Sequence, residues 1–231
     1  MTSFSFHAVP EIIVGADSAL SLGHLCQRQG ITKPLLVTDA GLIEVGIIGP
    51  IAAAMVEQLG DFPVFSGVTA DPADVIVDAA WSDLKTFGCD GVVAVGGGSS
   101  MDVGKVVAAL ACGDQTLTEM YGVNQVLGGR LPLILVPTTA GTGSEATPVA
   151  VITTGATTKA GVSSPTLLPD IAVLDATLTL NLPRAATAMT GIDAMVHAVE
   201  AYTTKLKKNP ISDALALRAL RLLSANIRPA M

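Results

Sequence analysis

The chain has 231 residues; half of them are hydrophobic and only 3% are aromatic, which allows one large domain or two small ones with an aliphatic core. Thirteen basic and 20 acidic residues give a net charge of −7, which argues against nucleic acid or an anionic membrane as a partner. The sequence has no run of 18 apolar residues and no basic segment leading into an apolar stretch, so we expect neither a membrane span nor a signal peptide. Cys26, Cys89 and Cys112 are widely spaced and predict buried thiols in a reducing cytoplasm.

Short β-branched runs alternate with Ala- and Leu-rich amphipathic stretches through about residue 180. The predicted strands are 35–39, 64–65, 91–95, 131–136 and 171–174, and the predicted helices between them are 52–59, 75–87 and 102–111. The Thr- and Gly-rich segment 153–158 is predicted to be a loop. Strands that alternate with helices predict an α/β fold, with a Rossmann-like parallel sheet covered on both faces.

The pattern changes near Leu182-Pro183. Two helices are predicted after it, at 185–203 and 211–227, with no strand between them. We therefore place a domain boundary there, with an α/β dinucleotide-binding domain at 1–182 and the start of an all-helical domain at 183–231. Two or three amphipathic helices alone expose a large apolar face, so we expect this helical domain to be incomplete.

A glycine-rich turn, GGGSSMDVGK, lies between the strand at 91–95 and the following helix. Its glycines let the backbone approach a bulky anion, and the amides at the helix N-terminus point at that anion. Met101 occupies the last glycine position of the dinucleotide fingerprint, and Val106 stands where a P-loop has Ser or Thr. The turn is typical of a pyrophosphate site, and a tight turn without a ligand is the alternative.

Polar residues also follow two other predicted strands. Asp39 ends the first of these strands, where a carboxylate can accept the ribose hydroxyls of NAD and repel the 2′-phosphate of NADP. The alternative for Asp39 is a helix N-cap. The segment 137–145, PTTAGTGSE, offers several hydroxyls at the sheet edge, where ligands sit in open α/β sheets. The alternative for this segment is a loop capped by its own hydroxyls.

Asp193 and His197 are four residues apart in TGIDAMVHAVE, so a helix places them on one face, one turn apart. A carboxylate and an imidazole that converge in this way suit a divalent ion such as iron or zinc. The alternative is an early-helix Asp and a core His. Glu200 is interpreted as structural. A usable site needs a further ligand, and the other histidines, His7 and His24, are far away in the sequence.

Taken together, the segments 91–105, 137–145, 168–179 and 187–202 resemble the iron-containing (group III) alcohol dehydrogenase family, whose fold is dehydroquinate synthase-like. The resemblance implies an N-terminal domain that binds NAD, a helical domain that binds one divalent metal, Fe or Zn, a small alcohol or aldehyde substrate, and a homo-oligomer such as a dimer. It also implies that Asp193 and His197 are the first two metal ligands. The implied cofactor-binding residues are Asp39 at the ribose, Gly97, Gly98 and Ser99 at the pyrophosphate, and Thr138, Thr139, Thr142 and Lys159 along the cleft.

Two departures from the family pattern matter. Asp71 stands where members often carry Asn, which leaves a role for Asp71 in cofactor binding open. The family supplies two more histidines downstream, whereas this chain ends 34 residues after His197, so we expect much of the helical domain to be missing. The alternatives are a maleylacetate reductase, a glycerol dehydrogenase or a dehydroquinate synthase on the same scaffold, a nucleotide-binding protein without turnover, and an interaction fragment.

Overall fold

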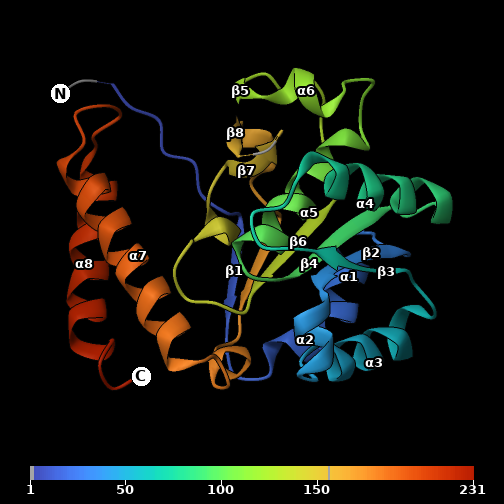
Figure 1. The fold of residues 1–231 in the computed structure, drawn as a ribbon, viewed down its shortest axis with the longest axis horizontal. Helices are drawn as coiled ribbons and strands as arrows, with labels where there is room; N and C mark the ends of the chain where they lie inside the picture. Colours follow the sequence, from blue (N-terminus) through green and yellow to red (C-terminus); the bar gives the residue numbers. More distant parts are fainter. Residues whose placement is uncertain (1–2, 156) are drawn as a thin grey trace.

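The computed structural model describes residues 3–155 and 157–231, and its centre is a six-stranded sheet with the order β1-β9-β6-β4-β2-β3 (Figure 1). All neighbouring strands in this sheet are parallel, so their carboxyl ends meet at one edge. This architecture confirms the predicted α/β fold. The strands are β1 (Glu11–Val14), β2 (Pro34–Asp39), β3 (Val64–Val68), β4 (Gly91–Gly96), β6 (Leu133–Pro137) and β9 (Ile171–Leu174).

Helices cover both faces of the sheet. α1 (Leu22–Arg28) and α3 (Ile48–Leu59) pack on one face, and α4 (Asp74–Phe87) and α5 (Gly98–Leu110) pack on the other. Successive residues of a strand point to opposite faces, so Val93 and Val95 of β4 belong to the first core and Val92 and Ala94 to the second. α5 lies very close to the sheet: a Cβ atom on Gly104 would stand 2.7 Å from the Cβ atom of Ala94.

A second sheet has three strands in the order β5-β8-β7. β7 (Val149–Thr154) and β8 (Thr158–Ser163) form an antiparallel hairpin, and β5 (Gly122–Val123) runs parallel to β8. The prediction of a loop over 153–158 is therefore wrong at both ends, because β7 continues to Thr154 and β8 begins at Thr158; residue 156 lies outside the described residues. Ala150 and Ile152 of β7 are buried in the same core as α5.

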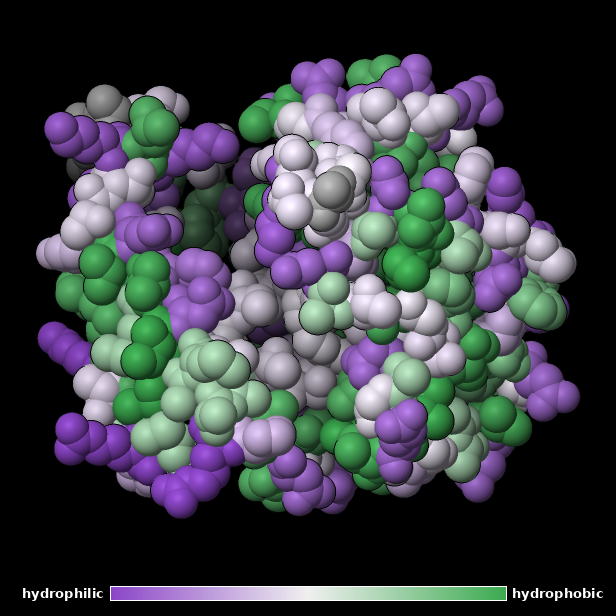
Figure 2. All heavy atoms as spheres, in the orientation of Figure 1, coloured by the Kyte–Doolittle hydropathy of each residue, from purple (hydrophilic) through white to green (hydrophobic). Residues whose placement is uncertain are grey.

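α7 (Arg184–Thr203) and α8 (Pro210–Asn226) form an antiparallel pair beside the α/β part (Figure 1). The Asn209 side chain accepts the Ser212 amide at 2.9 Å and caps the start of α8. The two helices pack chiefly on each other, and large apolar side chains of α7 remain exposed, including Met189 (67% exposed) and Ile192 (57%). Hydrophobic residues gather on the surface of this helical part (Figure 2). α7 follows Pro183, and the domain boundary between 182 and 183 stays a prediction.

The remaining elements are short, and several predicted boundaries shift. They are α2 (Ala40–Glu44), α6 (Leu117–Met120) and the 3-10 segments Ser18–Ser21, Ser144–Ala146, Pro165–Leu167 and Ala176–Thr179. α5 begins at Gly98 rather than at residue 102, because Gly97 adopts the extended N-cap conformation and the glycine-rich segment itself forms the first turn. Cys112 is exposed, contrary to the prediction that all three thiols are buried. Over the described ranges, no helix combines the length and apolar character needed to cross a bilayer.

Candidate functional site

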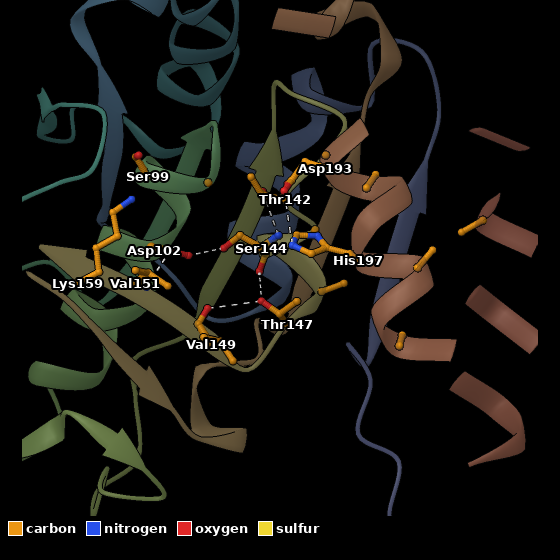
Figure 3. Close-up of a pocket in the computed structure, with 18 of the residues that line it drawn as sticks. Ser99, Asp102, Thr142, Ser144, Thr147, Val149, Val151, Lys159, Asp193 and His197 are labelled. Atoms are coloured by element: carbon orange, nitrogen blue, oxygen red, sulfur yellow. Dashed lines mark hydrogen bonds and ion pairs between the residues drawn. The ribbon is translucent and has the colours of Figure 1, made fainter. Parts of the chain in front are cut away.

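A cleft of about 1050 Å³ lies between the carboxyl edge of the sheet and the helices α7 and α8 (Figure 3). The α/β part contributes the first turns of α5, the segment after β6, and the hairpin of β7 and β8. The helical part contributes one face of α7 and residues of α8. The charged and hydroxyl-bearing side chains in the lining are Asp71, Ser99, Asp102, Thr142, Ser144, Thr147, Thr153, Lys159, Asp193, His197 and Ser212.

The parallel pairing of β4 with β6 brings two predicted cofactor segments together. Gly96 pairs with Pro137, and the Thr138 amide donates to the Gly96 carbonyl at 3.0 Å. The turn at 97–99 therefore lies beside the segment 138–142. The first-turn amides of α5 have no carbonyl partner within the helix, so they form an anion-binding end. A Cβ atom on Gly98 would stand 3.0 Å from Cγ2 of Thr142, so these two chain segments meet where only glycine fits without displacement.

Buried hydroxyls at the strand ends supply a test of whether a dinucleotide fits. Thr138 is buried, and Thr139 Oγ1 is buried without a hydrogen-bond partner anywhere in residues 3–155 and 157–231. Thr139 Oγ1 would lie 3.7 Å from a Cβ atom on Gly97, so it faces the glycine-rich turn. Buried hydroxyls are normally satisfied, and a phosphate or ribose oxygen at the turn would satisfy this one. The residues present therefore fit a dinucleotide.

Lys159 lies in β8, on the same α/β side of the cleft as Ser99 and Asp102 (Figure 3). Its Nζ atom is 2.6 Å from Oδ1 of Asp71, and both side chains are largely exposed. Asp71 has a positive φ of 51°. The Asp71 carbonyl accepts the hydroxyl of Thr153 in β7 at 3.0 Å. The loop that carries Asp71 is thus tied to the hairpin that carries Lys159, and the ion pair borders one end of the cleft.

Asp39 lies at the carboxyl end of β2, where it caps α2. Its Oδ1 atom accepts the Leu42 amide at 3.0 Å, so the alternative role of Asp39, a helix N-cap, is present. The described cleft lining does not include Asp39. A capping bond occupies one carboxylate oxygen, and the ribose role stays a prediction for the other.

Asp193 and His197 point into the cleft from α7 (Figure 3). Asp193 Oδ1 and His197 Nε2 are 3.7 Å apart, and both side chains are about half exposed. Metal–ligand bonds of about 2.0–2.2 Å allow two atoms at this separation to share one ion. The described residues contain no group of three or more His, Cys, Asp or Glu side chains that could hold a metal. The pair therefore fits half of a metal site, and Glu200 adds nothing to it because the described lining omits Glu200.

A close backbone contact fixes α7 against the segment that follows β6. A Cβ atom on Gly141 would stand 2.6 Å from both Cβ and the carbonyl oxygen of Thr190. Thr190 lies one turn before Asp193 on the same helix. This contact therefore sets how far the acid–histidine pair stands from the α5 N-terminus.

The sequence prediction missed a buried polar cluster under the cleft. Lys105 of α5 is 0% exposed, and its Nζ atom donates to Ser144 Oγ at 2.7 Å and to the Val149 carbonyl at 2.8 Å. Ser144 Oγ donates in turn to Asp102 Oδ1 at 2.5 Å. Burial lowers the pKa of Lys105 to about 8, against the opposing effect of Asp102 and Glu145. Burial also raises the pKa of Asp102. The signal in the sequence was a lysine directly before the apolar run 106–111.

The structure brings some of the predicted site residues together and leaves others beside the cleft. Those that line it are Gly98, Ser99, Thr142, Lys159, Asp193 and His197. Those outside the described lining, at the ends of β2, β4 and β6, are Asp39, Gly97, Thr138 and Thr139. The first set joins an anion-binding helix end to a potential metal pair across one cleft.

Curated proteins are similar in sequence to nearly the whole of this chain. Probable alcohol dehydrogenase EutG of Salmonella typhimurium is 38% identical over 229 residues, which cover 98% of this chain and 58% of the relative. NAD-dependent methanol dehydrogenase of Bacillus methanolicus is 35% identical over 221 residues, which cover 95% of this chain and 58% of the relative. The chain thus spans about 58% of the length of these curated relatives.

Solved structures share the fold over the whole chain. A 1,3-propanediol oxidoreductase matches with a TM-score of 0.95 and 35% identity, over 99% of this chain and 60% of that one. The sulfoacetaldehyde reductase of Bifidobacterium kashiwanohense, solved in complex with NAD+, matches with a TM-score of 0.90 and 29% identity, over 100% and 61%.

Two family models also match. The model described as iron-containing alcohol dehydrogenase matches residues 10–176, and the model described as Fe-containing alcohol dehydrogenase family, C-terminal, matches residues 187–231. The chain belongs to the iron-containing alcohol dehydrogenase family.

Proposed function

We propose that this chain provides the cofactor site and the first metal ligands of an NAD-dependent and metal-dependent alcohol dehydrogenase, which transfers hydride between a small alcohol or aldehyde and the nicotinamide. The observation that carries the proposal is the cleft itself, which places the α5 N-terminus opposite Asp193 and His197. The NAD+ complex of the related sulfoacetaldehyde reductase supports NAD as the cofactor.

The chain's own residues bind and orient the cofactor. The amides of Gly98 and Ser99 hold the pyrophosphate, and Thr142 packs against the same turn. Lys159 neutralises phosphate charge from the hairpin wall. Asp39 accepts the adenosine ribose hydroxyls and disfavours the 2′-phosphate of NADP. This arrangement holds the dinucleotide in the cleft that Asp193 and His197 line, which shortens the path for hydride transfer.

Asp193 and His197 would hold the metal, iron or zinc. When bound, the metal would polarise the alcohol oxygen as a Lewis acid, and the nicotinamide would accept the hydride. Since the described residues offer two ligands, a chain that binds NAD without turnover is a second candidate function.

The proposal also includes a homo-oligomer, a dimer, and a cytoplasmic location. Maleylacetate reductase and glycerol dehydrogenase are the alternative activities for the same cleft.

The test measures NAD+ binding by calorimetry and metal content by elemental mass spectrometry on the purified chain. We expect NAD+ to bind; about one metal ion per chain retained through gel filtration would show that a further ligand completes the half-site of Asp193 and His197. His197→Ala should lose the metal and keep NAD+, whereas the control His24→Ala, at an exposed position on α1, should keep both.

The outcomes separate the candidates. Metal retention together with oxidation of small primary alcohols supports the dehydrogenase. NAD+ binding without retained metal or turnover supports the second candidate. A chain that binds neither NAD+ nor metal contradicts both.

A further inference from the structure

A carboxylate lies one helical turn below the proposed pyrophosphate site. Asp102 is four residues after Gly98 and three after Ser99 on α5, so all three share one face of the helix, and all three line the cleft. Both oxygens of Asp102 accept hydrogen bonds: Oδ1 accepts Ser144 Oγ at 2.5 Å, and Oδ2 accepts the Val151 amide at 2.9 Å. A carboxylate fixed in this place repels a phosphate that docks at the same helix end.

The positive charge of Lys105 offsets this carboxylate from inside the protein. Lys105 Nζ lies 3.7 Å from Asp102 Oδ1, and the lysine side chain is 0% exposed whereas that of Asp102 is 14% exposed. The ammonium group donates to Ser144 Oγ at 2.7 Å, to the Val149 carbonyl at 2.8 Å and to Thr147 Oγ1 at 3.3 Å. It is thus held on three sides beneath the cleft floor, where it does not itself reach the lining.

The other charged groups nearby do not replace Lys105. Glu145, in the 3-10 segment after β6, is mostly buried and adds a second negative charge that acts on Lys105. Lys159, a cation in the cleft lining, pairs with Asp71 at 2.6 Å, whereas the ion pair of Asp102 is with Lys105; Lys159 thus acts on the phosphates from the hairpin and leaves the charge of Asp102 to Lys105. The charge at the floor of the cleft therefore depends on Lys105.

We propose that Lys105 is a positioning residue for the cofactor: its buried charge cancels that of Asp102 beneath the α5 N-terminus and so allows the dianionic pyrophosphate to dock at Gly98 and Ser99. The inference deepens the proposed function and rests on it. It predicts that substitutions of Lys105 and Asp102 change the affinity for ligands that carry the phosphates and leave the affinity for adenosine unchanged.

The test compares NAD+, ADP and adenosine as ligands of the full chain, by calorimetry with competition for the weak ligand. In Lys105→Met the affinity for NAD+ and ADP should fall roughly tenfold, while that for adenosine stays within about twofold. The double variant Lys105→Met/Asp102→Asn should recover the affinity for ADP to within roughly threefold of the unaltered chain.

A variant of opposite sign keeps the test independent of folding. Asp102→Asn keeps the side-chain volume and removes the negative charge below the phosphate site, so it should bind ADP and NAD+ several-fold more tightly and adenosine unchanged. If Lys105→Met fails to give a cooperative thermal transition, this variant decides the question. An equal loss for ADP and adenosine, or an Asp102→Asn variant that gains no affinity for ADP, overturns the inference.

The two proposals fail in different ways. If the unaltered chain binds neither NAD+ nor ADP, the proposed function is wrong and the inference falls with it. If the unaltered chain binds both and the ratio of ADP to adenosine affinity is the same in all variants, only the inference is wrong.

Discussion

Asp39 illustrates how one side chain can carry a structural and a proposed binding role at once. Its Oδ1 atom caps α2 by accepting the Leu42 amide, and its position at the carboxyl end of β2 is that of a ribose-binding carboxylate. Removal of the whole carboxylate would therefore mix two effects, because loss of an N-cap costs about 0.5–2 kcal/mol by itself.

The first prediction separates these effects. Asp39→Asn keeps a side-chain oxygen that can cap α2 but removes the negative charge, so its thermal stability should stay close to that of the unaltered chain. Its affinity for NADP+ should rise relative to that for NAD+, because the repulsion of the 2′-phosphate is gone. Asp39→Gly should lose stability as well. An unchanged ratio of NAD+ to NADP+ affinity in Asp39→Asn would show that Asp39 does not face the ribose.

The second prediction concerns stability against pH. Burial lowers the pKa of Lys105 from 10.5 to about 8, so the unfolded chain holds this proton more tightly and the free energy of unfolding rises between pH 8 and 10.5. Burial raises the pKa of Cys26 to about 12 and that of Cys89 to about 11, each from 9.0. Both thiols therefore lower the free energy of unfolding as the pH rises past about 9. Urea unfolding should show a gain well below about 1 kcal/mol from pH 8 to 9, because the two thiols already offset most of the effect of Lys105 there, and a decline above pH 9. Lys105→Met should abolish the gain, and Cys26→Ala should weaken the decline.

At the scale of elements, the placement of α7 depends on how closely the backbone after β6 approaches it. Gly141 allows this approach, because any larger residue would meet the backbone of Thr190 at 2.6 Å. The metal pair and the anion-binding helix end belong to different elements, so a shift of α7 changes their separation without altering either group.

The third prediction uses this contact. Gly141→Ala should displace α7, destabilise the chain by about 1–3 kcal/mol and reduce retention of metal, while NAD+ affinity changes less. Gly49→Ala in α3 is the control, because a Cβ atom there meets nothing within 4 Å, and it should alter neither ligand. Metal content and unfolding by denaturant measure the two effects. Full metal retention in Gly141→Ala would mean that the contact does not position α7.

The sequence predicted the large sheet better than the small one, for a physical reason. β4 and β9 are fully or nearly fully buried β-branched runs, and such runs stand out in any window. β7 alternates exposed and buried residues within a Thr-rich segment, and its hairpin turn contains Gly155, so the loop composition masked the strand. The helical pair after Pro183 was predicted to within one residue at each end, because capping and periodicity agree there.

The candidate site was predictable where it depends on strand ends. Gly98, Ser99 and Thr142 follow β4 and β6 directly, and parallel pairing brings such residues to one edge. Lys105 was not predictable in the same way, because its burial depends on Ser144 and Val149, which approach it only in the folded chain.

At the scale of the whole molecule, the two parts differ in how much they bury. α5 is buried along most of its length against the sheet, whereas in α7 the buried residues are Gly191 and Ala198. The apolar side chains of α7 that remain exposed include Ile192 and Val196. Segments that bury little apolar surface open at lower free energy than the core.

The fourth prediction is therefore a division in hydrogen exchange. The backbone amides of α7 and α8 should exchange faster than those of β4 and α5 under native conditions, as measured by mass spectrometry of peptic peptides. Saturating NAD+ should protect α5 and leave α8 little changed. Equal protection of α5 and α8 without ligand would show that the helical pair opens only with the whole chain.

The pairing of β1 with β9 has a consequence for synthesis of the chain. Glu11 pairs with Ile171, so β1 is synthesised about 160 residues before β9, the strand that becomes its neighbour. At bacterial or eukaryotic translation speeds that interval is roughly 10–30 s, during which β1 has an unpaired backbone and the sheet lacks one edge. β2, β4 and β6 can meanwhile assemble in the order in which they emerge. The addition of β1 to the edge of the sheet is thus the folding step most exposed to chaperones and to pairing with a neighbouring nascent chain.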